Sequence, residues 1–232
     1  MKEYFELRGL NETTYSNHEL QAWLAIELSA KGKDARILDF GCGFGQNILA
    51  LKRLGWSSVS GCDINPKALT HCASEGLDVF DITTLDLALD DRKGSYDIIY
   101  TTHVLEHIPV ESVIETLSKL KQLLKPGGTI VVAVPNAQSY TNAYWRYEDF
   151  THHILYTAGS LQYILLSAGF SNPTLIDQYG LAGAGTSKRI IKKFFIDYYR
   201  LKTWFWKKIL GSPTHIASEN VYTWEVKMKA EA

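Results

Sequence analysis

Closely spaced glycines behind a carboxylate mark the part of the sequence that is best suited to hold a ligand. An apolar run from Ala35 ends in Asp39, and glycines follow at every second position, as Gly41, Gly43 and Gly45. Because glycine has no β-carbon and tolerates positive φ, a strand–turn–helix unit of this kind can present amide N–H groups to an anionic group. The spacing therefore predicts a cofactor site at this turn.

The position of the third glycine separates this turn from that of dinucleotide-binding proteins. Their fingerprint reads G-x-G-x-x-G, whereas Gly45 comes one residue early and Gln46 stands where the last glycine would be. A nicotinamide-dependent dehydrogenase is therefore the weaker interpretation of this pattern.

Further strand-like runs also end in polar residues. One ends in Asp63, twenty-four residues after Asp39, close to the offset of about 20 residues at which a carboxylate holds a nucleotide ribose. The next two end in Asp81 and Thr102. Helix-like segments between such runs predict a parallel sheet, and the carboxyl ends of its strands would bring these side chains to one crevice.

Five blocks in this order resemble the class I S-adenosylmethionine-dependent methyltransferases. They are the glycine turn, the runs ending in Asp63 and Asp81, and the segments 96–108 and 124–136. The resemblance implies an α/β fold, with a Rossmann-like, seven-stranded, mostly parallel sheet, helices on both faces and an antiparallel last strand. It also implies that S-adenosylmethionine is the cofactor.

The same resemblance assigns the residues that contact the cofactor. Asp63 is expected to accept hydrogen bonds from two ribose hydroxyls, and Asp81 to face the adenine amino group unless it is an ordinary strand-end aspartate. An aromatic ring such as Phe44, Tyr144 or Trp145 would attract the sulfonium, unless it only fills the core or the cap. The full cofactor set is Asp39, Gly41, Cys42, Gly43, Phe44, Asp63, Ile64, Asp81, Ile82, Thr102 and His103.

Paired histidines fall where this fold would place a methyl acceptor. Methyl transfer from a sulfonium is an in-line displacement. Alignment of the two reactants can therefore lower the activation barrier by ~7–11 kcal/mol, and a positioned base can raise the rate by a further factor of about 10²–10⁴. The segment 148–157 is similar to a block that lies over the acceptor pocket in small-molecule and sugar methyltransferases. We expect His153 or His152 to be the base, oriented by Asp149 or Glu148, or else one histidine of the pair to cap a turn.

A second group of histidines follows the fourth predicted strand. The pair Glu106-His107 recurs in the family across unrelated acceptors, so the resemblance implies an architectural role for His107. His103 is expected to border the cofactor.

Composition and local patterns narrow the class of protein. The chain has a net charge of -1, whereas proteins that neutralise nucleic-acid phosphates normally carry an excess of basic residues. Residues 101–104 (TTHV) also stand where base-modifying methyltransferases usually carry an Asn- or Asp-Pro-Pro-aromatic block. The three cysteines, Cys42, Cys62 and Cys72, have no C-x-x-C spacing, which indicates neither a disulfide framework nor a zinc cluster. We therefore expect no nucleic-acid partner and no metal.

The N-terminus does not resemble a secretory signal, and no apolar run approaches the ~18 residues that cross a bilayer. We therefore expect a cytoplasmic protein.

The whole chain, 1–232, is expected to form one methyltransferase domain. Its parts are a cofactor-binding core over 35–136, a cap over the acceptor site at 137–157 and a basic amphipathic helical insertion at 188–210. Tyr15 and His18 are weaker cofactor candidates, because the family often folds its N-terminus over the site. The pattern predicts strands at 35–40, 58–62, 77–82, 96–101, 129–134 and 221–228, and helices at 16–31, 46–54, 66–74 and 110–124. The resemblance to the family implies a further helix at 158–170 and a sixth strand at 173–179.

The insertion at 188–210 carries apolar residues at three- and four-residue steps together with eight cations against Asp197 alone. One interpretation is a helix that packs on the sheet or against the second copy of a homodimer. The other is a surface that touches an anionic membrane or a phosphate-bearing substrate.

These observations favour a methyltransferase that acts on a small-molecule acceptor. Family likeness makes O-methylation of a sugar or of a nucleotide-linked polysaccharide precursor the leading prediction. An N-methyltransferase and a lipid or quinone methyltransferase are the alternatives within the same chemistry. A non-catalytic scaffold subunit that binds S-adenosylmethionine is the alternative outside it.

Overall fold

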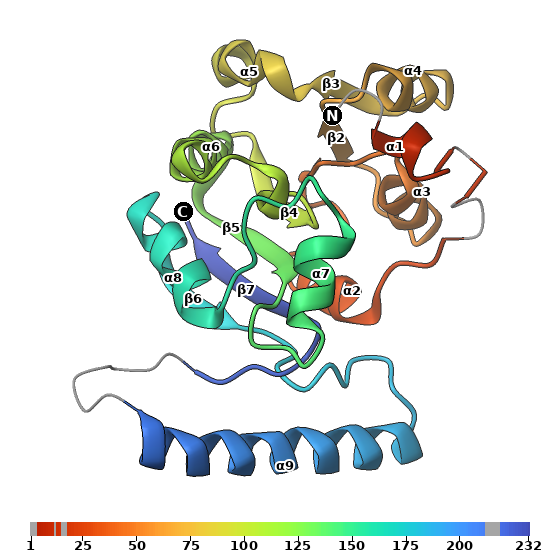
Figure 1. The fold of residues 1–232 in the computed structure, drawn as a ribbon. Coiled ribbons are helices and arrows are strands. Elements are labelled where there is room, and N and C mark those ends of the chain that lie inside the picture. The colour runs from red at the N-terminus through yellow and green to blue at the C-terminus, as the bar shows by residue number, and fades with distance from the viewer. Residues whose placement is uncertain (1–3, 12, 15–17, 212–218) are drawn as a thin grey trace.

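A seven-stranded sheet forms the centre of the computed structural model, which describes residues 4–11, 13–14, 18–211 and 219–232. The strand order is β3-β2-β1-β4-β5-β7-β6 (Figure 1). Neighbouring strands from β3 to β5 run parallel, and β7 runs antiparallel to both β5 and β6. This arrangement confirms the predicted Rossmann-like fold. The strands are β1 (Ile37–Phe40), β2 (Val59–Asp63), β3 (Asp78–Asp81), β4 (Tyr96–Thr102), β5 (Leu124–Pro135), β6 (Ser171–Leu175) and β7 (Glu225–Glu231).

Helices cover both faces of the sheet, with α6 and α8 on one side and α2 and α3 on the other (Figure 1). The first face carries α5 (Leu85–Arg92), α6 (Val110–Leu123) and α8 (Ala158–Ser167), and the second carries α2 (Ala22–Ser29), α3 (Gln46–Arg53) and α4 (Pro66–Ser74). The remaining elements are α1 (Tyr4–Leu7), α7 (Asn142–Glu148), α9 (Thr186–Leu210) and the short 3-10 helices η1 (Ile82–Thr84) and η2 (Leu105–His107).

Strand β1 shows why the sheet needs two covering layers. All of its residues are buried, Ile37 in the core with α2 and α3, and Leu38 in the core with α6 and α8. Runs buried on both faces are typical of parallel strands in α/β proteins. Asp39 is the polar residue of this strand, and it is buried at the end that leads into the glycine turn.

Several element boundaries differ from the predicted ones. The helix predicted at 16–31 begins only at Ala22, because Gln21 has extended backbone angles. Strand β6 ends at Leu175 instead of residue 179, because Asp177 adopts a positive φ of 43° and its carboxylate accepts the backbone N–H groups of Leu181 and Ala182. Strand β5 starts early, at Leu124, whereas β7 is displaced to 225–231, and the sequence pattern did not predict α5 or α7.

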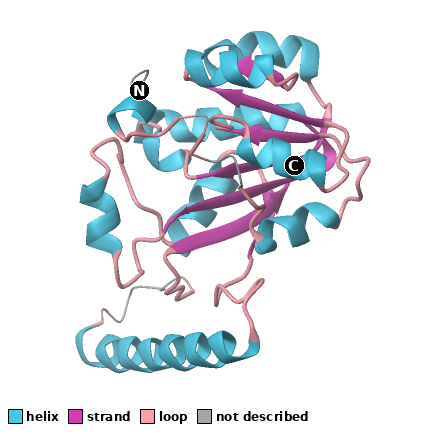
Figure 2. Ribbon diagram, turned by 90° about the vertical axis from the view of Figure 1, so that its right-hand side faces the viewer, coloured by secondary structure: helices cyan, strands magenta, loops and turns pink. Residues whose placement is uncertain are grey.

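Helix α9 stands apart from the sheet at one end of the molecule (Figure 2). Ile196 is the only buried residue of this helix. The contacts that hold it run to loops: Lys192 Nζ donates to the carbonyl of Gly180 at 2.6 Å, and the rings of Tyr199 and Tyr140 lie 5.3 Å apart. The segment therefore does not pack on the sheet, which was one of its predicted roles.

None of the described helices, α9 included, combines the length and the apolar character that crossing a bilayer requires.

Candidate active site

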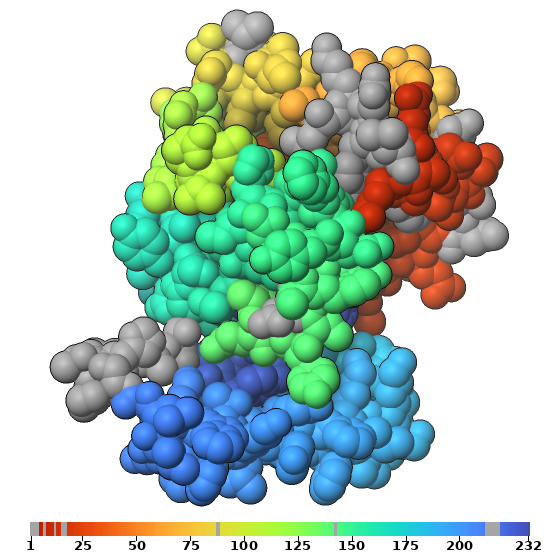
Figure 3. Space-filling view, in the orientation of Figure 1, coloured from red at the N-terminus to blue at the C-terminus, as the bar shows by residue number. Residues whose placement is uncertain are grey.

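A cavity of about 780 Å³ opens at the carboxyl ends of β1, β2, β3 and β4. In the space-filling view (Figure 3), the segment after β5 (green) covers the middle of the face beside the N-terminal residues (red). The cavity wall includes seven of the predicted cofactor residues, from the ends of four strands. They are Gly41, Gly43, Asp63, Ile64, Ile82, Thr102 and His103.

The three glycines of the turn have different tasks, although all have positive φ. A β-carbon on Gly41 would lie 2.1 Å from Val104 Cγ2, and one on Gly45 would lie 2.6 Å from Leu77 Cδ1. Both positions therefore need glycine for close packing. Gly43 borders the cavity, and a β-carbon there would meet its first atom, in Phe5, at 3.5 Å. The turn can thus bring its main chain against a ligand.

Asp63 ties the turn after β1 to the end of β2. Its Oδ2 accepts the backbone N–H of Gly43 at 2.8 Å, and its Oδ1 accepts that of Asn65 at 2.8 Å. Burial raises the pKa of the Asp63 carboxyl, while these backbone hydrogen bonds lower it. Because a carboxylate oxygen has more than one lone pair, both oxygens can still accept from hydroxyls of a ligand in the cavity.

Asp39 lies behind the glycine turn with almost no exposure. Its Oδ2 has no hydrogen-bond partner among the residues that the structure describes. Burial raises the pKa of this carboxyl to about 7. A hydrogen bond from the Tyr100 hydroxyl lowers the pKa, and the nearby charge of Asp63 raises it. An unsatisfied carboxylate beside a turn that exposes amide groups fits the amino-acid end of S-adenosylmethionine, which carries an ammonium and a carboxylate.

Four predicted cofactor residues do not line this cavity. Asp39 and Cys42 are buried behind the turn. Phe44 is covered by Phe5, with the ring centroids 4.9 Å apart. The Oδ1 atom of Asp81 caps η1 by accepting the N–H of Thr83 at 2.8 Å, as an ordinary strand-end aspartate would. Direct contact of these four side chains with a cofactor therefore stays a prediction.

The N-terminal segment reaches this half of the cavity. His18 lines it, and its Nε2 lies 2.8 Å from Oδ1 of Asn47. Tyr15 lies outside the described residues.

The two histidines predicted as candidates for the catalytic base lie in different environments. His152 is buried and lines the cavity, whereas His153 and Glu148 are exposed and do not. The Nδ1 of His152 lies 2.7 Å from the carbonyl oxygen of Trp145, so Nδ1 donates its proton to that oxygen. Asp149 Oδ2 lies 3.9 Å from Nε2 of the same ring, beyond hydrogen-bond distance, so the orientation of His152 by Asp149 stays a prediction.

Asp149 is linked to His107 through Thr151. Thr151 Oγ1 donates its proton to Asp149 Oδ1 at 2.6 Å, so it must accept from His107 Nδ1, which lies 2.7 Å away. The other oxygen of Asp149 pairs with Arg8 at 3.0 Å. Burial lowers the pKa of His107, although the nearby Glu106 charge opposes that change. The loop thus orients a neutral imidazole with Nε2 as its acceptor nitrogen.

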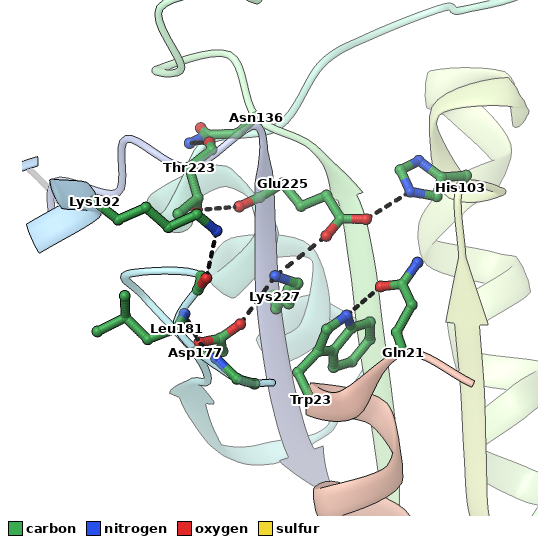
Figure 4. Close-up of polar contacts among 12 residues, drawn as sticks. Gln21, Trp23, His103, Asn136, Asp177, Leu181, Lys192, Thr223, Glu225 and Lys227 are labelled. Carbon is green, nitrogen blue, oxygen red and sulfur yellow. Dashed lines mark hydrogen bonds and ion pairs between the residues drawn. The ribbon is translucent and has the colours of Figure 1, made fainter. Parts of the chain in front are cut away.

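His103 is held between two carboxylates, an arrangement that the sequence did not reveal. It has a positive φ of 58°, and its ring nitrogens lie 3.4 Å from Glu106 Oε1 and 2.7 Å from Glu225 Oε1. Burial lowers its pKa, but the two carboxylates raise it to about 10. Glu225 also pairs with Lys227 at 3.2 Å, and Lys227 with Asp177 at 3.4 Å (Figure 4).

Two tryptophans form an aromatic wall on the acceptor side. Trp224 stacks on His103 with centroids 5.1 Å apart and an interplanar angle of 10°, and Trp145 lies 5.7 Å from Trp224. Ile108 and Pro109 add apolar surface to the same cavity. This half of the cavity can therefore take a flat, largely apolar acceptor.

Both the sequence and the fold of the chain are similar to those of known methyltransferases. A family model described as "Methyltransferase domain" matches residues 13–175. The ubiquinone biosynthesis O-methyltransferase of Nitrosococcus oceani is 34% identical over 106 residues, 44% of each chain. That of Caulobacter vibrioides is 36% identical over 105 residues, 43% of this chain and 40% of the relative. The chain thus spans less than half the length of the curated relatives it matches.

Solved structures share the fold at low identity. A SAM-dependent methyltransferase from Archaeoglobus fulgidus superposes with a TM-score of 0.63 at 19% identity, covering 100% of this chain and 97% of that one. A SAM-dependent methyltransferase from Thermotoga maritima, described as a possible histamine N-methyltransferase, gives 0.60 at 13% identity, covering 91% and 87%.

Proposed function

Because this chain belongs to the class I S-adenosylmethionine-dependent methyltransferase family, we propose that it transfers a methyl group to a phenolic hydroxyl of a quinol-type acceptor. S-adenosylmethionine is the cofactor of this family, and it supplies an electrophilic methyl group when bound. The sequence alone favoured a sugar acceptor. The curated relatives, which are named ubiquinone biosynthesis O-methyltransferases, favour the quinone alternative instead.

One half of the cavity would hold the cofactor. The main chain at Gly41 and Gly43 would lie against its amino-acid end, with the unsatisfied Asp39 carboxylate behind the turn. Asp63 would accept from the ribose hydroxyls, because it borders the cavity and is fixed by two backbone N–H groups. Ile64 and Ile82 would supply apolar surface to the adenine.

The observation that carries the proposal is the wall that His107 and His152 form in the acceptor half of the cavity. The two rings meet edge to face with centroids 4.7 Å apart, and each has its Nδ1 committed to a fixed partner. An acceptor hydroxyl must lose its proton to attack a methyl group, and this wall is where a hydroxyl can be bound and acidified. The wall formed by Trp145 and Trp224 would hold the acceptor ring beside it.

Helix α9 supports an acceptor that is carried in a membrane. Ile190, Phe194, Leu201 and Phe205 recur at four- and seven-residue steps, and each is more than half exposed. At 100° per residue, this stripe lies opposite the buried Ile196, so it faces away from the protein. The helix also carries eight cations against one acid. An outward apolar face with flanking cations suits the interface of an anionic membrane.

Product analysis tests this function. The full chain would be incubated with S-adenosylmethionine and three acceptor classes: a short-chain quinol, a nucleotide sugar and a primary amine. We expect S-adenosylhomocysteine and an O-methylated quinol, with His153→Ala as active as wild type and His152→Ala slower. Methylation of the sugar or amine alone would replace the proposed acceptor, and no turnover with any class would favour a binding scaffold.

A further inference from the structure

We propose that Glu106, His107 and His152 bind a divalent transition-metal ion in the acceptor half of the cavity. Glu106 and His107 belong to η2 after β4, and His152 lies in the loop after α7. One potential ligand atom from each of the three lies within 4.8 Å of the other two. All three side chains line the cavity, so an ion bound there would be reached by an acceptor.

The hydrogen bonds around the two histidines orient both for metal binding. His152 donates from Nδ1 to the Trp145 carbonyl, and His107 donates from Nδ1 to Thr151, which passes its own proton to Asp149. Metal-bound histidines almost always donate their second ring N–H to a carbonyl or to a carboxylate system in this way. Because Nδ1 is the donor in both rings, Nε2 is the nitrogen through which each ring, in its neutral form, would bind a metal.

The buried carboxylate of Glu106 gives independent support for a bound cation. Its side chain has 0% exposure, and neither carboxylate oxygen has a hydrogen-bond partner within the described part of the chain. The nearest cation, His103, lies 3.4 Å from Oε1 and is shared with Glu225 at the shorter distance of 2.7 Å. Oε2 is therefore unsatisfied, and buried charges in proteins are normally paired or bound to metals.

The ligand chemistry limits the ion. Two imidazole nitrogens and one carboxylate oxygen suit Zn²⁺, Mn²⁺, Fe²⁺ or Co²⁺, whereas Mg²⁺ and Ca²⁺ prefer oxygen ligands. Three protein ligands also leave a coordination position open, as catalytic sites do. The sequence gave no sign of this site, because its ligands come from segments forty-five residues apart without a metal-binding spacing.

The metal site deepens the proposed function and rests on it for its role in the reaction. A phenolic hydroxyl that takes the open position would lose its proton to water at the cavity mouth, because the ion lowers its pKa. The resulting oxygen anion would form the new C–O bond with the methyl carbon. The C–S bond would break, and its electron pair would stay on sulfur in S-adenosylhomocysteine.

Metal binding by the tag-free full chain tests the site without reference to turnover. Chelator-treated protein would be dialysed against Zn²⁺, and Co²⁺ would be followed by visible absorption, which reports coordination by nitrogen and oxygen. We expect one ion per chain, with binding at least tenfold weaker in His152→Ala and Glu106→Gln. Binding should be about 10–100-fold weaker in Thr151→Val, which removes the hydroxyl that holds His107 Nδ1. His153→Ala is the matched control and should bind like wild type.

The outcomes separate the two proposals. Equal Zn²⁺ binding by wild type and His152→Ala, or no binding by wild type, would overturn the metal site, whereas methylation of a quinol would still uphold the function. Calorimetry with S-adenosylmethionine checks that each variant keeps its fold, because the cofactor half lies on other residues. Stoichiometric, His152-dependent binding in an enzyme that methylates no quinol would uphold the site and overturn the acceptor.

Discussion

The backbone N–H of Gly43 donates to Oδ2 of Asp63 at 2.8 Å, so the glycine turn after β1 is fixed by the same carboxylate that borders the cavity from the end of β2. This bond explains how two segments twenty residues apart form one binding surface. A ligand that contacts both would meet a preformed site, because the turn does not have to be ordered on binding.

Replacing Asp63 by alanine should weaken S-adenosylmethionine binding by about 1.5–3 kcal/mol, the scale of hydrogen bonds to a charged group. The substitution removes the proposed contacts to the ribose and also the hydrogen bond that Gly43 N–H donates to Asp63 Oδ2. Calorimetry measures it, with the exposed Asp34 at the opposite end of β1, changed to alanine, as the control. Equal affinities of the two variants would remove Asp63 from the site.

Replacing Gly41 by alanine should destabilise the protein more than the same change at Gly76. Both glycines have positive φ, of 87° and 68°, so each substitution carries a similar backbone cost of about 1–2 kcal/mol. Only at Gly41 would the new methyl group lie 2.1 Å from Val104, whereas nothing lies within 4 Å at Gly76. We expect ~1–3 kcal/mol of additional loss from overpacking, measured by urea unfolding. Equal unfolding midpoints would show that the close approach to Val104 is absent.

Asp39 should make the stability of the cofactor-free protein depend on pH. Its pKa of about 7 when folded exceeds the ordinary aspartate value of 3.8, so the folded state binds more protons. The stability from this group is present below pH 3.8 and is lost as the pH rises through about 7. The free energy of unfolding of wild type relative to Asp39→Asn should therefore fall by up to ~4 kcal/mol over that window. A constant difference would contradict the buried, unsatisfied carboxylate.

Helix α9 should bind anionic lipid vesicles through both its apolar stripe and its cations. Co-sedimentation should be strong at about 0.1 M salt and weaker at about 1 M, where the Debye length is ~3 Å. The double variant Phe194→Ser, Phe205→Ser should lose binding, whereas Tyr163→Ser, an equally exposed site on α8, should not. Vesicle-independent dimers that the same double variant dissociates would instead assign the stripe to a second copy of the chain.

The sequence predicted the parts of the site that depend on local spacing. Gly41, Gly43 and Asp63 could be placed because strand ends in a parallel sheet meet at one edge, whatever the rest of the chain does. The fold followed from the same alternation of strand-like and helix-like runs. The short helices α5 and α7 escaped prediction because their apolar residues show no clear helical period.

The parts that depend on long-range contacts could not be predicted. Glu225 pairs with His103 across 122 positions, and no local pattern connects them. The adjacent His152 and His153 are chemically identical, and only the course of the loop decides that one is buried and the other exposed. The relay from Asp149 to His107 likewise needs the loop to fold back on η2, which gave His107 an environment that its family pattern had not suggested.

The cavity between the turn at Gly43 and the end of β2 should bind S-adenosylmethionine. Titration calorimetry of the full chain with S-adenosylmethionine, S-adenosylhomocysteine and NADH tests it most directly. We predict binding of the first two at one molecule per chain, weakened by Asp63→Ala, and no binding of NADH. Binding of NADH without binding of S-adenosylmethionine or its product would contradict the account.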